Sequence, residues 1–99
     1  MILVVAKLDV PEEHREAFKT AAAQAAGRTR QEDGCGAYDL HEAVEQPGRF
    51  VFVEEWRDQA ALDAHAASEH MREFREALRG KLSGADIVAH DVSASTKRG

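Results

Sequence analysis

The sequence predicts an α+β fold, in which a four-stranded antiparallel sheet carries helices on one of its faces. Three observations support this fold class. Segments typical of strands and helices follow one another in the order strand, helix, strand, strand, broken helix, strand. A turn signal joins the two middle strands as an antiparallel hairpin. The chain has 99 residues, which is enough for one compact domain and too few for two.

The composition excludes several classes of function. The net charge is −5, which argues against binding the phosphate backbone of nucleic acids or an anionic membrane surface. No apolar run reaches the roughly 18 residues that span a bilayer, and residues 1–6 lack the basic start and the length of a secretory signal. Cys35 is the only cysteine, so no internal disulfide can form, and a cytoplasmic location fits.

The chain opens with a strand followed by a helix. Residues 2–10 are rich in β-branched side chains and predict the first strand. Pro11, Glu12 and Glu13 then favour a helix start, because proline is tolerated in the first turn and acidic groups suit the positive end of the helix dipole. The helix should run to about residue 31. Its apolar stripe is narrow and consists of Ala17, Phe18, Ala21, Ala22, Ala25 and Thr29.

Two strands and their turn form the predicted hairpin. Residues 37–42 alternate loosely, Gln46-Pro47-Gly48 is a turn signal, and residues 50–56 alternate clearly. In the clearest strand, one face carries Phe50, Phe52, Glu54 and Trp56, and the other carries Val51, Val53 and Glu55. The pattern therefore predicts one strand with apolar side chains on both faces.

The second helical region is interrupted. Asp58 is expected to cap a helix over residues 59–67, and Ser68 is expected to cap a second segment over residues 69–80. The apolar stripe of this second segment consists of Met71, Phe74 and Leu78.

The chain ends with a fourth strand and a polar tail. Residues 85–92 form the expected strand, so the domain covers residues 1–93 and residues 94–99 are expected to be a disordered polar tail. The complete order, βαββαβ, is that of ferredoxin-like folds, which place the helices on one face of the sheet.

The first and third strands indicate that both faces of the sheet are covered. Leu3, Val5, Val51 and Val53 would point away from the helices. Leaving such side chains in water forfeits about 1.5–3 kcal/mol each, and the sum rivals the stability of a small domain. The simplest cover is a second copy of the chain, which predicts a homodimer with sheet facing sheet.

Four stretches, taken in order, resemble a known family. They are Ile2 to Ala6, then Asp33-Gly34-Cys35 leading to Tyr38, then Arg49 to Trp56, then Leu62 with Ala64 to His70. Together they resemble the antibiotic biosynthesis monooxygenase (ABM) domain, especially its small quinol-monooxygenase-like bacterial members. The resemblance covers most of the chain. It implies a dimeric α+β barrel with a cavity in each subunit between the sheet and the helices.

The resemblance also implies a chemistry. Characterised relatives oxygenate phenolic or hydroquinone-like aromatics with dioxygen and without a metal, flavin or haem cofactor. The haem-degrading members instead use an asparagine on the first strand and a histidine late in the second helical region. Ala6 and Arg75 stand near those positions here, which argues against haem degradation.

His65 and His70 are the candidate catalytic residues. An imidazole at a cavity wall can accept a phenol proton near neutral pH, because its unperturbed pKa is about 6.5. His65 is the expected base, and His70 could orient it or bind a substrate oxygen. The alternatives stay open that His65 only bridges helix and sheet, and that His70 is a polar residue at a helix start. Their spacing is not the i, i+4 pattern of paired metal ligands, so no metal is expected.

Six further side chains are expected to bind substrate. They are Tyr38, Phe52, Glu54, Trp56, Met71 and Phe74. Flat rings suit stacking on an aromatic substrate, and core packing is the alternative role for the aromatic members. Glu54 either lies near the cavity with a raised pKa or pairs with a base such as Arg72, and the pair is the preferred interpretation.

These observations predict a cofactor-independent monooxygenase that oxidises a small quinol or polyphenol-type aromatic with dioxygen. No glycine-rich phosphate motif is present, so a nucleotide cofactor is not expected. Two alternatives use the same scaffold. One is an isomerase in which His65 and Glu54 move protons. The other is a non-catalytic dimer that binds a metabolite or acts in a stress response.

Overall fold

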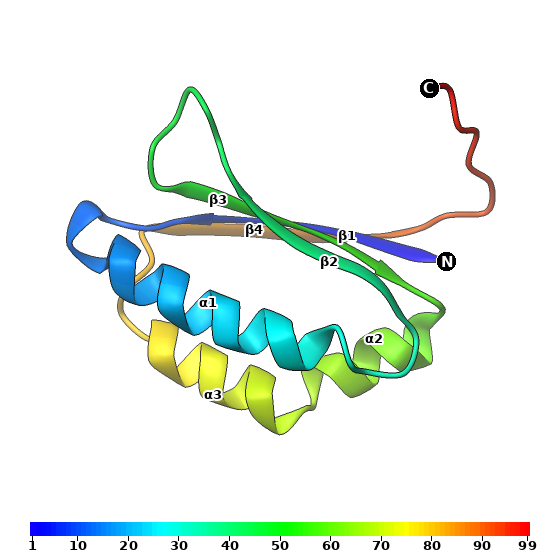
Figure 1. Cartoon of the computed structure of the whole chain (residues 1–99), viewed down its shortest axis with the longest axis horizontal. Helices are drawn as coiled ribbons and strands as arrows, with labels where there is room; N and C mark the ends of the chain where they lie inside the picture. The colour runs from blue at the N-terminus through cyan, green and yellow to red at the C-terminus, as the bar shows by residue number, and fades with distance from the viewer.

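A computed structural model describes all 99 residues of the chain (Figure 1). In chain order its elements are β1 (Ile2–Asp9), the short 3-10 helix η1 (Glu12–His14), α1 (Arg15–Thr29), β2 (Cys35–Glu42), β3 (Arg49–Trp56), α2 (Gln59–Ala66), α3 (Glu69–Leu78) and β4 (Gly84–Asp91). The predicted α+β, ferredoxin-like fold is confirmed. No helix is both long and apolar enough to cross a membrane.

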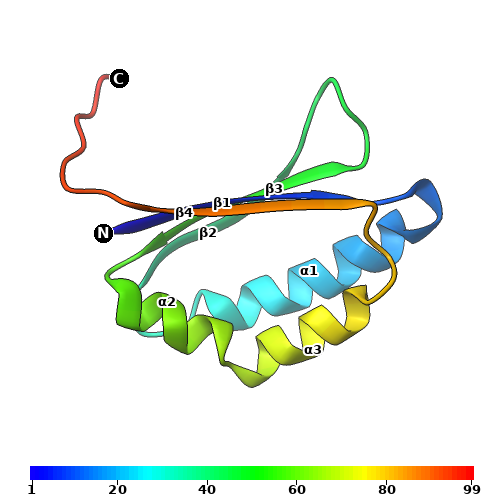
Figure 2. The same ribbon diagram turned by 180° about the vertical axis from the view of Figure 1, so that it is seen from behind.

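The four strands form one antiparallel sheet in the order β2-β3-β1-β4. All helices lie on one side of this sheet, with α1 and α3 side by side (Figures 1 and 2). Cross-strand partners share a face. Because Ala6 pairs with both Phe52 and Ile87, these three side chains belong to the helix side. Val5 pairs with Val53 and Val88, which places that row on the outer side.

Two boundaries of helices and strands differ from the prediction, because the backbone geometry decides them and the side-chain pattern does not. Pro11 is extended, and a 3-10 turn precedes α1, so the helix starts later than its proline and acidic residues suggested. β2 begins at Cys35, because Gly34 adopts a φ of +86° that turns the chain directly into the sheet. Cys35 already pairs with Trp56, and a bulge follows before Ala37.

The core on the helix side is centred on Phe18. Its ring lies 4.6 Å from the ring of Phe50 and 6.1 Å from that of Phe74. Ala22 and Ala25 are buried, and their small side chains allow a close approach of α1 to the sheet. Ala17 is exposed, contrary to the prediction, because it stands one residue, or about 100°, before Phe18 around the helix.

The helical layer does not reach the edge strand β4. Ile87 faces the helix side and is still 64% exposed. On the outer side Leu3, Val5, Val51 and Val53 are only half-buried, and no element of the chain packs over them. The tip of the β2–β3 hairpin and the C-terminal tail both project on this outer side, toward opposite ends of the sheet (Figures 1 and 2).

Candidate functional site

An apolar cavity of about 470 Å³ lies between the sheet and the helices α2 and α3. Six of the residues that the sequence singled out line it: Tyr38, Phe52, Glu54, His65, Met71 and Phe74. Most of the remaining wall is aliphatic and includes Val4 and Leu62. A chamber of this size and character suits one small planar aromatic molecule.

Two of the predicted residues, Trp56 and His70, do not line this cavity. Trp56 is completely buried behind it, because the end of β3 is covered by α2. Its ring lies 4.5 Å from the His65 ring, and its Nε1 donates a hydrogen bond to Glu54 Oε1 at 2.9 Å. Trp56 therefore supports the two polar groups of the cavity instead of forming its wall.

His70 connects to the cavity through a residue that the sequence analysis missed, Glu32. Glu32 Oε2 lies 2.7 Å from His65 Nδ1 and 2.9 Å from His70 Nε2. The three side chains are 16%, 5% and 14% exposed, respectively. Glu32 sits in the turn after α1, where its backbone bonds to Thr29 on one side and Cys35 on the other. This double anchor holds the carboxylate under α2.

The hydrogen bonds of Ser68 determine which nitrogens carry protons. Ser68 Oγ donates its one proton to the carbonyl oxygen of His65 at 2.7 Å, so it can only accept from His70 Nε2 at 3.2 Å. His70 Nε2 is therefore protonated and also donates to Glu32. The carboxylate in turn accepts from Nδ1 of His65. In the tautomer with its proton on Nδ1, His65 has a lone pair on Nε2, and its only side-chain hydrogen bond within the chain is the one that Nδ1 makes to Glu32.

Glu54 is the second polar group of the cavity. Burial raises its pKa above the ordinary value, and the Trp56 N–H and the nearby His65 offset only part of that effect. The preferred pair with Arg72 is wrong. Arg72 bonds to Glu69 on the outside of α3, because it stands about 100° around the helix from the cavity-facing Met71. The pKa of the Tyr38 phenol is raised as well. Burial is the main cause, and the negative charges of Glu54 and Glu32 add to it.

Glu32, His65 and His70 also form a group that could in principle hold a metal ion, because their potential ligand atoms all lie within 4.8 Å of one another. One carboxylate oxygen serves both rings, at 2.7 and 2.9 Å, and these are hydrogen-bond lengths. Two atoms that bind one tetrahedral zinc ion at about 2.0–2.2 Å lie roughly 3.3–3.6 Å from each other, farther apart than these atoms are. The geometry is therefore that of a histidine–carboxylate–histidine hydrogen-bond cluster.

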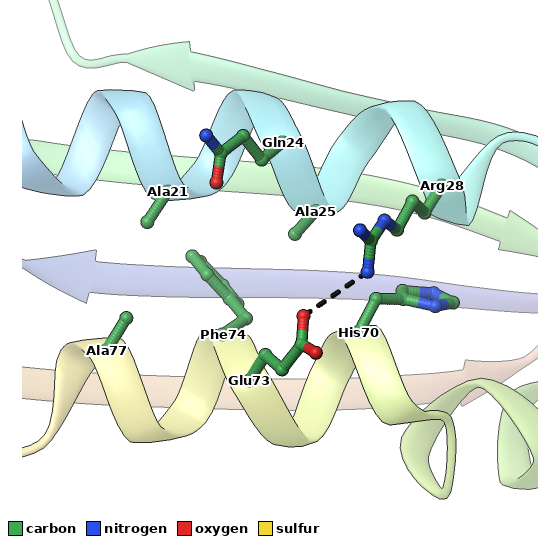
Figure 3. Close-up of a pocket in the computed structure, with 8 residues that line it drawn as sticks. All are labelled: Ala21, Gln24, Ala25, Arg28, His70, Glu73, Phe74 and Ala77. Atoms are coloured by element: carbon green, nitrogen blue, oxygen red, sulfur yellow. Dashed lines mark hydrogen bonds and ion pairs between the residues drawn. The ribbon is translucent and has the colours of Figure 1, made fainter.

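A separate groove of about 420 Å³ runs between α1 and α3. Figure 3 shows its alanine-rich sides and the ion pair that closes over it, in which Arg28 Nη1 lies 3.2 Å from Glu73 Oε2. His70 lies near one end of this groove, and Phe74 lines both the groove and the cavity. His70 thus faces this second space, while His65 faces the cavity.

The comparisons with known proteins agree with this arrangement. The sequence profile of the family described as antibiotic biosynthesis monooxygenase matches residues 1–77. The chain belongs to the antibiotic biosynthesis monooxygenase family. The monooxygenase candidate YcnE of Bacillus subtilis is 34% identical over 94 residues, which cover 94% of this chain and 99% of that protein. YgiN of Escherichia coli, a probable quinol monooxygenase, is 29% identical over 97 residues, with 88% and 93% covered.

Solved structures of ABM proteins show the same fold. A crystal structure of an antibiotic biosynthesis monooxygenase candidate from Deinococcus radiodurans superposes with a TM-score of 0.94 at 27% identity, covering 100% of this chain and 99% of the other. Rv0793 of Mycobacterium tuberculosis superposes with a TM-score of 0.89 at 27% identity, covering 97% and 98%. These likenesses support a general monooxygenase role for this ABM protein, with oxygen and a small molecule as reactants.

Ala6 and Arg75, which the sequence analysis placed near the two positions used by haem-degrading members, both line the cavity. Their side chains are a methyl group and a guanidinium, which is always charged and donates only, so neither is a ligand for iron.

Replacing Glu54 by glutamine is expected to stabilise the ABM domain at neutral pH. Below its ordinary pKa of 4.5 the carboxyl is protonated in both states and has no effect. As the pH rises, Glu54 loses its proton first in the unfolded chain, because its pKa is raised in the folded protein. The free energy of unfolding of the wild type therefore falls until Glu54 also ionises in the folded protein. Thermal unfolding of E54Q should show a higher Tm at pH 7 and a gain that vanishes near pH 4.

The control for this experiment is E55Q, which neutralises the exposed neighbour on the outer face. Its effect on Tm should be small at both pH values. A Tm gain in E54Q that does not change with pH would show that desolvation of the Glu54 charge is not its cause.

Proposed function

We propose that this protein is a cofactor-independent monooxygenase that inserts one oxygen atom of dioxygen into a small quinol or polyphenol-type aromatic. The observation that supports it is a histidine in the wall of an apolar cavity, held at Nδ1 by the half-buried carboxylate of Glu32 and with no hydrogen bond within the chain at Nε2. Such a pair is suited to accept a phenol proton and to stabilise the resulting imidazolium. The electron-rich phenolate can then reduce dioxygen directly.

Each cavity residue has a role in the proposed reaction. The rings of Tyr38, Phe52 and Phe74, together with Met71, hold the aromatic substrate with its hydroxyl toward His65. His65 Nε2 takes the phenol proton, while Nδ1 stays bonded to Glu32. In this proposal Glu54, whose pKa burial raises, exchanges a proton with the oxygenated carbon. The aliphatic remainder of the wall keeps water from the reactive intermediates.

The proposed steps balance in atoms and electrons. The phenolate gives one electron to dioxygen, and the phenoxyl radical and superoxide combine at a ring carbon. The peroxide takes the proton held by His65. Loss of that carbon's hydrogen with cleavage of the O–O bond releases water and leaves a new carbonyl. For 1,4-dihydroxynaphthalene the sum is quinol plus dioxygen to hydroxynaphthoquinone plus water.

Oxygen labelling tests this function. The protein is incubated with 1,4-dihydroxynaphthalene or benzene-1,2,3-triol under ¹⁸O₂, and the product is examined by mass spectrometry. We expect one labelled oxygen per product above the rate of autoxidation. A quinone without label, or no acceleration over buffer for any member of a hydroquinone panel, contradicts the proposal. Turnover that persists under nitrogen instead supports an isomerase, for which His65 and Glu54 in one cavity provide two proton-transfer groups.

We also propose that the protein acts as a homodimer through the outer face of its sheet. Support comes from the half-buried aliphatic row there and from Val88, which is 42% exposed. The turn between β2 and β3 projects on the same side of the sheet (Figure 1), and Val44 in this turn is 98% exposed. A second sheet packed about 10 Å away would remove these side chains from water.

Replacing Glu32 by glutamine is expected to lower kcat about 10²–10⁴-fold while KM changes little. The amide can donate to Nδ1 of His65, which favours the tautomer that carries its proton on Nε2 and cannot accept one from substrate. Steady-state oxygen uptake measures the effect, and ¹⁵N NMR of the imidazole reads the tautomer. The matched control is D33N, because Asp33 is an exposed neighbour that pairs with Arg57. Equal losses in E32Q and D33N would remove Glu32 from the mechanism.

A further inference from the structure

The charged groups of the cavity wall are Glu54, His65, Arg75 and Arg79. The first two have partners inside the chain, namely Trp56 and Glu32. Arg79 Nη2 bonds to Glu76 Oε2 at 2.9 Å. The side chain of Arg75 makes no hydrogen bond or ion pair, although it lies on a helix that carries three glutamates.

The absence of a partner for Arg75 follows from how the glutamates of α3 are used. Glu69 binds Arg72, Glu73 binds Arg28 across the groove, and Glu76 binds Arg79. Every acidic side chain of α3 is thus taken by another arginine. The chain has 18 acidic and 13 basic side chains. A shortage of acidic side chains therefore does not explain why Arg75 has no partner. Its positive charge remains available to a ligand.

Arg75 stands at the mouth of the cavity. The cavity-facing stripe of α3 contains Met71, Phe74, Arg75, Leu78 and Arg79. Phe74 and Leu78 are buried, whereas Arg75 is exposed. Ile87 of the uncovered strand β4 lines the same cavity and is exposed as well. The opening therefore lies between α3 and β4, with an apolar interior and a cation at its rim.

We propose that the ligand of this cavity is an aromatic carboxylate, whose ring enters the apolar interior and whose carboxylate binds the Arg75 guanidinium at the mouth. The planar fork of arginine matches a carboxylate with two parallel hydrogen bonds. Glu54, on the sheet wall, disfavours the reversed orientation through its own carboxyl group. That this ligand is the substrate rests on the proposed function; that it binds does not.

Isothermal titration with two probes tests the proposal. Naphthalene-2-carboxylate and naphthalene-2-carboxamide have nearly the same shape, differ in charge and are not phenols, so binding is measured without turnover. We expect the wild-type protein to bind the carboxylate about tenfold more tightly than the carboxamide. R75Q should lose this preference by weakening carboxylate binding alone. R72Q removes the same charge from the outer face of α3 and should retain the preference.

Several outcomes would overturn the proposal: equal binding of both probes by the wild type, no binding of either probe, or the same behaviour in R75Q and R72Q. Circular dichroism of both variants checks that they are folded. The two proposals fail separately. A protein that prefers the carboxylate but incorporates no ¹⁸O contradicts only the monooxygenase function. One that oxygenates quinols but does not distinguish the probes contradicts only the role of Arg75.

Discussion

Replacing His65 by glutamine is expected to lower kcat for quinol oxygenation by about 10²–10⁴-fold, the range for removing a general base. Glutamine can still bond to Glu32, so the polar contact under α2 is kept while the basic Nε2 is lost. Oxygen uptake with the best quinol of the panel measures the rate. The difference in kcat between H65Q and the wild type should decrease as the pH approaches the pKa of the substrate phenol, because the substrate then ionises without a base from the protein.

The control for this variant is H14Q, which replaces a histidine of η1 that does not line the cavity. It should leave kcat unchanged. Thermal unfolding of both variants separates loss of catalysis from loss of structure. If H65Q is folded and turns over substrate at the wild-type rate, His65 is only a bridge between helix and sheet, and Glu54 becomes the remaining candidate base in the cavity.

Replacing Val53 by lysine is expected to convert a dimer into a monomer. Val53 lies in the middle of the outer face, where it pairs with Val5 on one side and Asp39 on the other. In a two-fold dimer the substitution occurs twice, and burying each ammonium costs several kcal/mol of desolvation, which the facing Asp39 offsets only in part. The dissociation constant should therefore rise by at least about 10³-fold. Sedimentation velocity at micromolar concentration measures it.

A matched control places the same charge elsewhere. A17K changes an exposed position on α1, on the opposite side of the molecule, and should sediment like the wild type. A wild-type protein that is a folded monomer at micromolar concentration would show that the aliphatic outer face needs no cover. A V53K protein that remains a dimer would place the interface on another surface.

The helix and strand pattern was predictable because its causes are local. Asp58 and Ser68 were expected as helix caps, and their side chains do accept from the backbone N–H of Ala61 at 2.9 Å and of Met71 at 3.3 Å. The alternation of β3 correctly separated Phe52 and Glu54 from Val51 and Val53. Such features depend on residues within a few positions of one another, so they can be predicted from the sequence.

The roles of individual site residues were less predictable. Glu32 lies in a polar turn next to Asp33, and no pattern distinguishes the two. Glu32 is nevertheless half-buried and bonds to His65 of α2, whereas Asp33 is exposed. Trp56 shares a face with Glu54, as the alternation indicates, but its place at the covered end of β3 puts it behind the cavity. Arg72 was close enough in sequence to suggest a partner for Glu54, and the phase of α3 directs it outward.

The sequence by itself determined the fold class, the hairpin, the interrupted helix and the faces on which the apolar side chains lie, because periodicity and capping act over one or two turns of chain. Only the tertiary structure decided that the turn after α1 brings Glu32 between His65 and His70, and that α3 leaves Arg75 without a partner at the cavity mouth. The physical reason is that these contacts join segments more than 30 residues apart or depend on competition among many charged groups. Such relations arise only when the elements pack against one another.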